Sequence, residues 1–164
     1  MMEFVYAYAY FVLYAFLGWV CEDLYCGIPA KKFINRGFFY GPYCPIYGVG
    51  ALLVLYPLLF VKDYPILVFV LGVIITSTLE YITSWVMEIL FKTRWWDYSE
   101  RFMNINGRVC LLNSTLFGIM SIVVVYIIHP VIQDIVMDIP FTALMSFLSA
   151  FTIGFGIDCV FTCL

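Results

Sequence analysis

Charged residues are scarce in this sequence. Lys, Arg, Asp and Glu make up 12% of its 164 residues, about half of the roughly 25% that a soluble domain carries. Apolar residues account for 65% of the chain, and its mean hydropathy is +1.01. The chain therefore has too little polar surface to cover itself in water. This excludes an ordinary soluble domain and predicts an integral membrane protein.

The usual catalytic and cofactor-binding motifs are also missing. The single histidine, His129, is expected on the opposite membrane face from the cysteines, which argues against a Cys–His nucleophile. Cys21 and Cys26 lack a zinc-ligand spacing and have no histidine near them. There is no G-x-x-x-x-G-K-[S/T] sequence, so the chain has no P-loop of its own for ATP. We therefore expect no metal, no cofactor and no nucleic-acid partner, and a non-enzymatic role is favoured over an enzymatic one.

Long apolar runs dominate what is present. Five of them approach the ~20 residues that cross a bilayer as a helix, although the second is short and contains Pro57. They predict an all-α, polytopic helical membrane protein with a single transmembrane domain over residues 1–164. The expected transmembrane helices, about five, cover residues 4–20, 46–61, 65–90, 110–128 and 140–160.

Basic residues are concentrated in alternate connections. Seven of the eight Lys and Arg residues lie in the first and third connections, and short loops rich in these residues stay on the cytoplasmic side. This asymmetry predicts an outside N-terminus and an inside C-terminus. The six cysteines then lie at or near the reducing inner face, so a disulfide framework is not expected.

Two of the predicted helices carry the same residue pattern 66 positions apart. Residues four apart share one face of a helix, and each helix has such a series ending in a glutamate. The match continues as W-V-x-E-x-L-[Y/F] and, after the helix, as G-x-x-C. We predict a parallel internal repeat over about 4–50 and 70–116 (4–61 and 65–128 with the following helices), with the site at the interface between the copies. The two series are Tyr6, Tyr10, Tyr14, Gly18 and Glu22, and Gly72, Thr76, Glu80, Ser84 and Glu88.

The last apolar run, at about 140–160, stands outside this repeat. Small and polar residues recur at four-residue spacing along it, which suits close packing against another helix. This face predicts a possible contact between two copies of the chain and hence a homo-oligomer. The residues are Ser146, Ala150, Gly154 and Asp158.

The segment at 94–114, RWWDYSERFMNINGRVCLLNS, joins charge, aromatic rings and amides in one connection. That combination is typical of a binding site at a membrane interface, here on the predicted inner side. Its counterpart at 31–48 alternates Gly and Pro too often for a regular helix, and irregular backbone at membrane depth must be buried in protein or line a cavity. The candidate binding residues of the two segments are Asn35, Arg36, Asp97, Asn104, Arg108 and Asn113.

Three glutamates complete the candidate site. Glu80 is predicted about two turns inside the membrane, where an ionisable residue costs at least about 2.5 kcal/mol. It is either a proton-coupling or cation-binding carboxylate or a structural hydrogen-bond acceptor for Tyr14 or the first loop. Glu22 and Glu88 lie at the inner ends of the repeated helices, and their expected partners are the arginines Arg36 and Arg108. The alternative is that these arginines hold a phosphate or carboxylate of a ligand.

Four blocks of the sequence resemble a known family. NRGFFYGPYCPIYG, LEYITSWVMEILF, RWWDYS and NINGRVCLLNSTLFG look like the bacterial membrane permease family called ABC-transporter type IV, the CmpB-like group. The resemblance covers nearly the whole chain. It implies a multi-pass protein of the bacterial inner (plasma) membrane, and any coupling to ATP would need a separate ATPase subunit.

Three functions remain open from the sequence. The first is a small permease or transporter with an inner-side polar site of Arg, Asn and Glu. The second is an intramembrane enzyme or binding protein acting on a phospholipid headgroup, in which Glu22 and Glu88 do acid–base work. The third is a structural or regulatory membrane subunit whose polar residues only hold the helices together. The expected partners are membrane lipids and an anionic small molecule or lipid headgroup.

Overall fold

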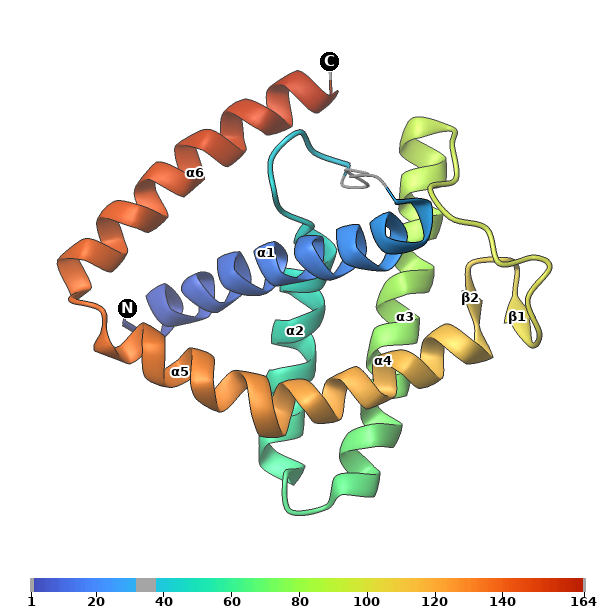
Figure 1. The fold of residues 1–164 in the computed structure, drawn as a ribbon, viewed down its shortest axis with the longest axis horizontal. Helices are drawn as coiled ribbons and strands as arrows, with labels where there is room; N and C mark the ends of the chain where they lie inside the picture. The colour runs from blue at the N-terminus through green and yellow to red at the C-terminus, as the bar shows by residue number, and fades with distance from the viewer. Residues whose placement is uncertain (1, 32–37, 164) are drawn as a thin grey trace. The chain divides into compact units, whose positions relative to one another are not determined.

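A computed structural model describes residues 2–31 and 38–163 (Figure 1). The regular secondary structure of these residues is helical apart from one antiparallel hairpin of two short strands. The elements in order are α1 (Met2–Ala30), α2 (Pro45–Leu58), the 3-10 turn η1 (Leu59–Val61), α3 (Pro65–Phe91), β1 (Asn104–Ile105), β2 (Val109–Cys110), α4 (Leu111–Val123), the π-helical turn η2 (Val124–Ile128), α5 (His129–Asp138) and α6 (Phe141–Cys163).

The fold class expected from composition is confirmed. Within the described residues, four helices are long and apolar enough to cross a membrane. The fifth apolar segment, Pro45–Val61, is helical but shorter, as the sequence indicated. The four candidate spans are Met2–Leu24, Pro65–Phe91, Leu111–Asp138 and Phe141–Thr162.

The segment 129–138, expected to be a loop, is helical instead. α4 runs through η2 into α5 and forms one apolar helix from Leu111 to Asp138. The helix continues through Pro130, although a proline cannot donate the usual helical hydrogen bond and its ring clashes with the preceding turn. The wider turn of η2 directly before it, where the His129 N–H bonds to the Val124 carbonyl, gives that ring room without ending the helix.

The chain divides into two compact units. The first comprises Met1–Leu52 and Val131–Leu164, and the second comprises Leu53–Pro130. In the first unit, α1 and α2 approach closely at two glycines. A Cβ added to Gly18 would lie 2.3 Å from the Cβ of Tyr47, and one added to Gly48 would lie 2.6 Å from the carbonyl oxygen of Phe11. Glycine at these positions therefore allows the two backbones to meet.

The last helix of the first unit is joined to α1 and to the segment before α2. The hydroxyls of Tyr8 on α1 and Thr152 on α6 are 2.8 Å apart. Further along α6, Asp158 accepts hydrogen bonds from the backbone amides of Tyr40 and Gly41. These contacts fix α6 against both partners within the unit.

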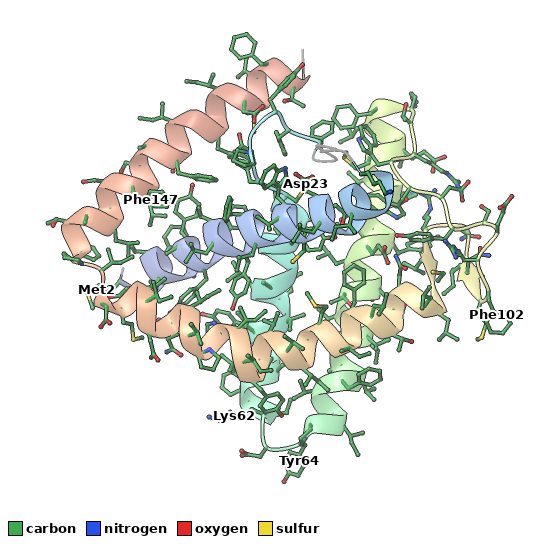
Figure 2. All side chains as sticks on the ribbon, in the orientation of Figure 1. Met2, Asp23, Lys62, Tyr64, Phe102 and Phe147 are labelled. Atoms are coloured by element: carbon green, nitrogen blue, oxygen red, sulfur yellow. The ribbon has the colours of Figure 1, made fainter. Side chains whose placement is uncertain are left out.

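In the second unit, α3 and α4 pack along small residues. An added Cβ on Gly72 would lie 2.5 Å from the Ser121 side chain, and the Ser77 hydroxyl donates to the Ser114 hydroxyl at 2.7 Å. Small residues permit the close approach on which helix association in membranes depends. Figure 2 shows Lys62 and Tyr64 at the turn that leads into α3, and Phe102 at the tip of the connection that contains β1 and β2.

Candidate functional site

The third connection, between α3 and α4, folds back on itself through a tight turn. Asn106 and Gly107 have φ angles of 54° and 68°, and the Arg108 amide donates to the Ile105 carbonyl at 3.0 Å. Two consecutive positive φ angles define a type I′ turn, for which Asn-Gly is the preferred pair. This hairpin was not predicted from the sequence, although the Asn-Gly dipeptide is its recognised signal.

The end of α3 directs the chain into this connection. Lys92 adopts the left-handed conformation at the end of the helix, and its N–H bonds to the Glu88 carbonyl. This is a common way to end a helix. The chain turns back at this point, so that Nε of Arg94 donates to Oε1 of Glu88 at 3.0 Å.

The hairpin turn carries Arg108 to the side of α3, where the arginine is buried. Its guanidinium donates to Oε2 of Glu88 and, at 3.2 Å, to the Ser84 hydroxyl. The same guanidinium lies 5.7 Å from the centre of the Tyr81 ring. Tyr81, Ser84 and Glu88 are three and four residues apart and so share one face of the helix. The expected pairing of Glu88 with Arg108 is present, which favours the structural interpretation of this pair over contact with a ligand phosphate.

A second polar cluster surrounds Glu80, which is buried on α3. The Tyr98 hydroxyl donates to Oε1 of Glu80 at 3.2 Å, and the Asn113 side-chain amide donates to the Tyr98 oxygen at 2.6 Å. A chain of hydrogen bonds thus joins α3, the third connection and α4. Glu80 and Asn113 were named from the sequence, but Tyr98 was missed because its aromatic neighbours suggested only an interfacial belt.

Asp97 and Asn104 hold the connection itself in shape. One oxygen of Asp97 accepts from both the amide and the hydroxyl of Ser99. Asn104 donates to the carbonyls of Ser99 and Arg101 and accepts from the Gly107 amide. Local bonds of this kind stabilise turns. The two residues predicted as ligand contacts therefore face their own connection.

Acidification is expected to loosen this connection at Asp97. The Ser99 hydroxyl, the Ser99 amide and Arg94 hold the pKa of Asp97 below its ordinary value. Because the folded-state pKa is the lower one, this stabilisation is complete above the ordinary pKa and is lost as the pH falls through the folded-state pKa. The protection of the Ser99 amide, measured as its hydrogen-exchange rate relative to the intrinsic rate at each pH and compared with Asp97→Asn, should fall below about pH 4. Equal protection of Ser99 in both proteins at pH 6 would contradict this role.

The remaining predicted residues belong to the first unit or lie outside the described residues. The Tyr47 hydroxyl donates to Oε2 of Glu22 at 2.6 Å. Asn35 and Arg36 are not among the described residues, so the expected pairing of Arg36 with Glu22 stays a prediction. Next to Glu22, Asp23 is buried, and neither of its carboxylate oxygens has a hydrogen-bond partner among the described residues. Asp23 was not singled out from the sequence.

The chain matches a known protein family, but it matches no curated protein and no solved structure. A family model described as "Putative ABC-transporter type IV" matches residues 9–163. The match to the family model extends over both polar clusters and over the four candidate spans, apart from residues 2–8 of the first span.

Proposed function

The chain belongs to the ABC-transporter type IV family, and we propose from that premise that it is a transporter membrane subunit with a ligand site around Glu80. Its four candidate spans and this family make it a transporter-like membrane protein. The proposal adds the location of the site and the role of its carboxylate. Bacterial inner-membrane residence is part of the same proposal.

The buried carboxylate of Glu80 is the observation that carries the proposal. It lies on an apolar helix of 27 residues, where insertion scales put the cost of an ionisable residue at about 2.5–3.5 kcal/mol. Tyr98 and Asn113 connect it to the third connection and to α4. Movement of either element would therefore change the surroundings of the carboxylate. A group of this kind is suited to binding and releasing a proton or a cation.

The energy source is proposed to lie in another subunit. The sequence contains no G-x-x-x-x-G-K-[S/T] motif, whose backbone and lysine would hold the phosphates of ATP. Coupling to ATP would accordingly require a separate ATPase. Uptake that is present in ATP-energised membrane vesicles and absent from proteoliposomes holding this chain alone would support that arrangement.

An internal duplication is proposed as the origin of the architecture. The start of α2 at Pro45 and the start of α4 at Leu111 are separated by the same 66 residues as the repeated sequence pattern. The contact of Gly48 with Phe11 has its counterpart, at that offset, in the bond between Ser114 and Ser77. Equal spacing of both the helices and their contacts supports two copies with one packing pattern.

Replacement of Glu80 by glutamine is expected to reduce transport at least tenfold. Glutamine keeps the size of the side chain and can still accept a hydrogen bond from Tyr98, but it can neither carry charge nor exchange a proton. Initial rates of uptake should be measured in energised vesicles with labelled sugars, amino acids, organic anions and organic cations. The pH dependence of uptake seen with the wild-type chain should disappear together with the rate.

The matched control is Glu100→Gln, which changes the same residue type at an exposed position of the third connection. This variant should transport at the wild-type rate. Wild-type rates with an unchanged pH profile in Glu80→Gln would refute the role of Glu80. Membrane abundance of each variant should be measured in parallel, so that loss of protein is not mistaken for loss of function.

A further inference from the structure

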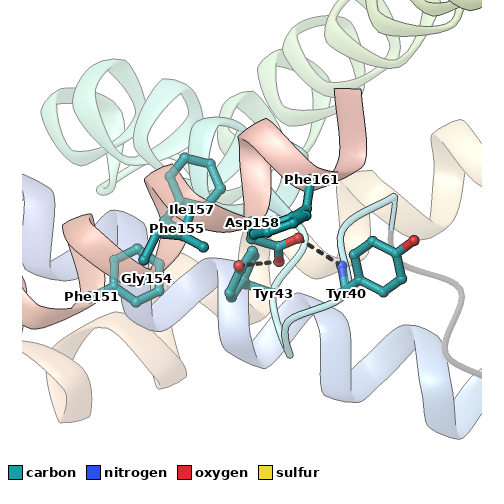
Figure 3. A pocket seen from close by; sticks show the side chains of 8 residues that line it. All are labelled: Tyr40, Tyr43, Phe151, Gly154, Phe155, Ile157, Asp158 and Phe161. Atoms are coloured by element: carbon teal, nitrogen blue, oxygen red, sulfur yellow. Dashed lines mark hydrogen bonds between the residues drawn. The ribbon is translucent and has the colours of Figure 1, made fainter. Parts of the chain in front are cut away.

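Beyond the cluster around Glu80, the first unit contains an open cavity of about 550 Å³ between α6 and the segment before α2. Figure 3 shows the carboxylate of Asp158 turned toward Tyr43 and the backbone of Tyr40, with the ring of Phe161 beside it. The cavity falls in the 300–1,000 Å³ range of small-molecule sites. Its lining is aromatic and apolar apart from Asp158: Tyr40, Tyr43, Phe151, Gly154, Phe155, Ile157 and Phe161.

The carboxylate of Asp158 has four hydrogen-bond donors. Oδ1 accepts from the Tyr40 amide at 3.2 Å and from the Thr162 hydroxyl at 2.9 Å. Oδ2 accepts from the Gly41 amide at 2.8 Å and from the Tyr43 hydroxyl. A carboxylate offers about four lone-pair sites, so these donors fill its capacity. Hydrogen bonds to the charged form favour ionisation.

The negative charge of Asp158 is not balanced within the described residues. The ion pairs found there join Glu88 to Arg94 and to Arg108, and the four donors to Asp158 are neutral. An uncompensated carboxylate on a membrane-spanning helix is costly. A cation held in the cavity would offset that cost.

The arrangement also restricts which cation fits. A metal ion or a primary ammonium needs free oxygen lone pairs, and those of Asp158 are already used. A quaternary ammonium has no N–H to satisfy and is attracted both by the charge and by the faces of aromatic rings. The rings of Tyr43, Phe151 and Phe155 already pack against one another, with centroids 5.3–5.9 Å apart, and so form a preformed wall.

We propose that this cavity binds a quaternary ammonium group, with Asp158 as the counter-charge and the rings of Tyr43, Phe155 and Phe161 as its walls. The site lies in the first unit and does not depend on the role proposed for Glu80. The group can come from a soluble compound or from a choline lipid headgroup. Both sources share the chemistry that the cavity recognises.

The full-length protein, purified in a maltoside detergent, should be titrated with choline, tetramethylammonium and methylammonium chlorides by calorimetry. Tetramethylammonium or choline is expected to bind at least tenfold more tightly than methylammonium. In a parallel experiment, native mass spectrometry after incubation with phosphatidylcholine or phosphatidylglycerol vesicles tests the lipid source. Choline binding without a phosphatidylcholine adduct assigns the site to a soluble compound, and a selective adduct without choline binding assigns it to the lipid.

Two variants separate binding from folding. Asp158→Asn should weaken binding at least tenfold, but it also disturbs the anchoring of Tyr40 and Gly41. Phe161→Leu avoids that problem because Phe161 is exposed, and it should weaken binding severalfold without changing the melting temperature. Phe147→Leu, an exposed position of the same helix away from the cavity, is the matched control and should bind as the wild type does.

Three results would overturn the proposal. The first is no binding of choline, tetramethylammonium or phosphatidylcholine. The second is equal affinity for methylammonium and tetramethylammonium, which would show that the filled hydrogen bonds of Asp158 do not select the ligand. The third is unchanged binding in both Asp158→Asn and Phe161→Leu.

Discussion

Replacing Arg108 with methionine is expected to lower the free energy of unfolding by about 2 kcal/mol, within the range for losing hydrogen bonds to a charged group, because the Glu88 side chain of this ion pair is 34% exposed. The substitution removes the bonds to Glu88 and Ser84 and the contact with the Tyr81 ring. Methionine keeps an apolar stem of similar length, so the loss reports the guanidinium rather than an empty space. Glu88 retains Arg94 as a partner, which limits the effect.

Denaturant unfolding in detergent micelles measures this change. Arg101→Met is the control, because Arg101 is an exposed arginine in the same connection, and its loss should change stability by less than about 0.5 kcal/mol. If the two variants are equally stable, Arg108 does not hold the third connection against α3. The structural account of Glu88 would then be wrong.

Replacing Gly48 with alanine is expected to destabilise the first unit by about 3 kcal/mol, the upper end of the usual overpacking cost. The new Cβ would lie 2.6 Å from the carbonyl oxygen of Phe11. A backbone atom of a packed helix cannot rotate away as a side chain can. Relief therefore requires α1 and α2 to separate along their contact.

The melting temperature in micelles measures this effect, and Gly156→Ala provides the control. An added Cβ at Gly156 meets nothing within 4 Å, so this variant should melt at or above the wild-type temperature. A normal melting temperature for Gly48→Ala would mean that α1 and α2 do not approach as closely as described. The contact of Ser77 with Ser114 would then have no equivalent between Phe11 and Gly48.

The sequence predicted the membrane-spanning helices of this protein well. Apolar runs near the length of a bilayer gave the spans. Of the four-residue series on α3, Gly72, Glu80 and Ser84 are buried. Helix periodicity reports burial directly, because a polar residue in a membrane helix is tolerated mainly where it faces protein. The pairing of Glu88 with Arg108 followed from the need to neutralise two charges at one membrane face.

Hydrogen-bond partners distant in sequence were predicted poorly. Tyr98 could not be assigned to Glu80, because an aromatic residue near a membrane interface has an equally good explanation as an anchor. The local bonds of Asp97 to Ser99, two residues away, were also not predicted, and the assignment of Asp97 to a ligand site stays a prediction. The anchoring of Gly41 by Asp158 joins residues 117 positions apart. No local pattern indicates such a contact.

Access of water to the cluster around Glu80 distinguishes a ligand site from a dry network that only holds the helices together. Ser114→Cys places a thiol next to Asn113. In the wild-type chain the Ser114 hydroxyl accepts a hydrogen bond from Ser77, which lies about one turn of α3 from Glu80. Labelling by a membrane-impermeant methanethiosulfonate, quantified by peptide mass spectrometry in vesicles of both orientations, measures that access. Glu100→Cys, at an exposed position of the third connection outside the candidate spans, and the native Cys110, which is buried, serve as references for fast and slow labelling.

If Glu80 lies in a ligand site, the thiol introduced by Ser114→Cys should be labelled from the predicted inner side at a rate close to that of the thiol introduced by Glu100→Cys. Labelling as slow as that of Cys110 in vesicles of both orientations would contradict this expectation. The polar residues around Glu80 would then be a structural network, and the ligand site of this protein would have to lie elsewhere.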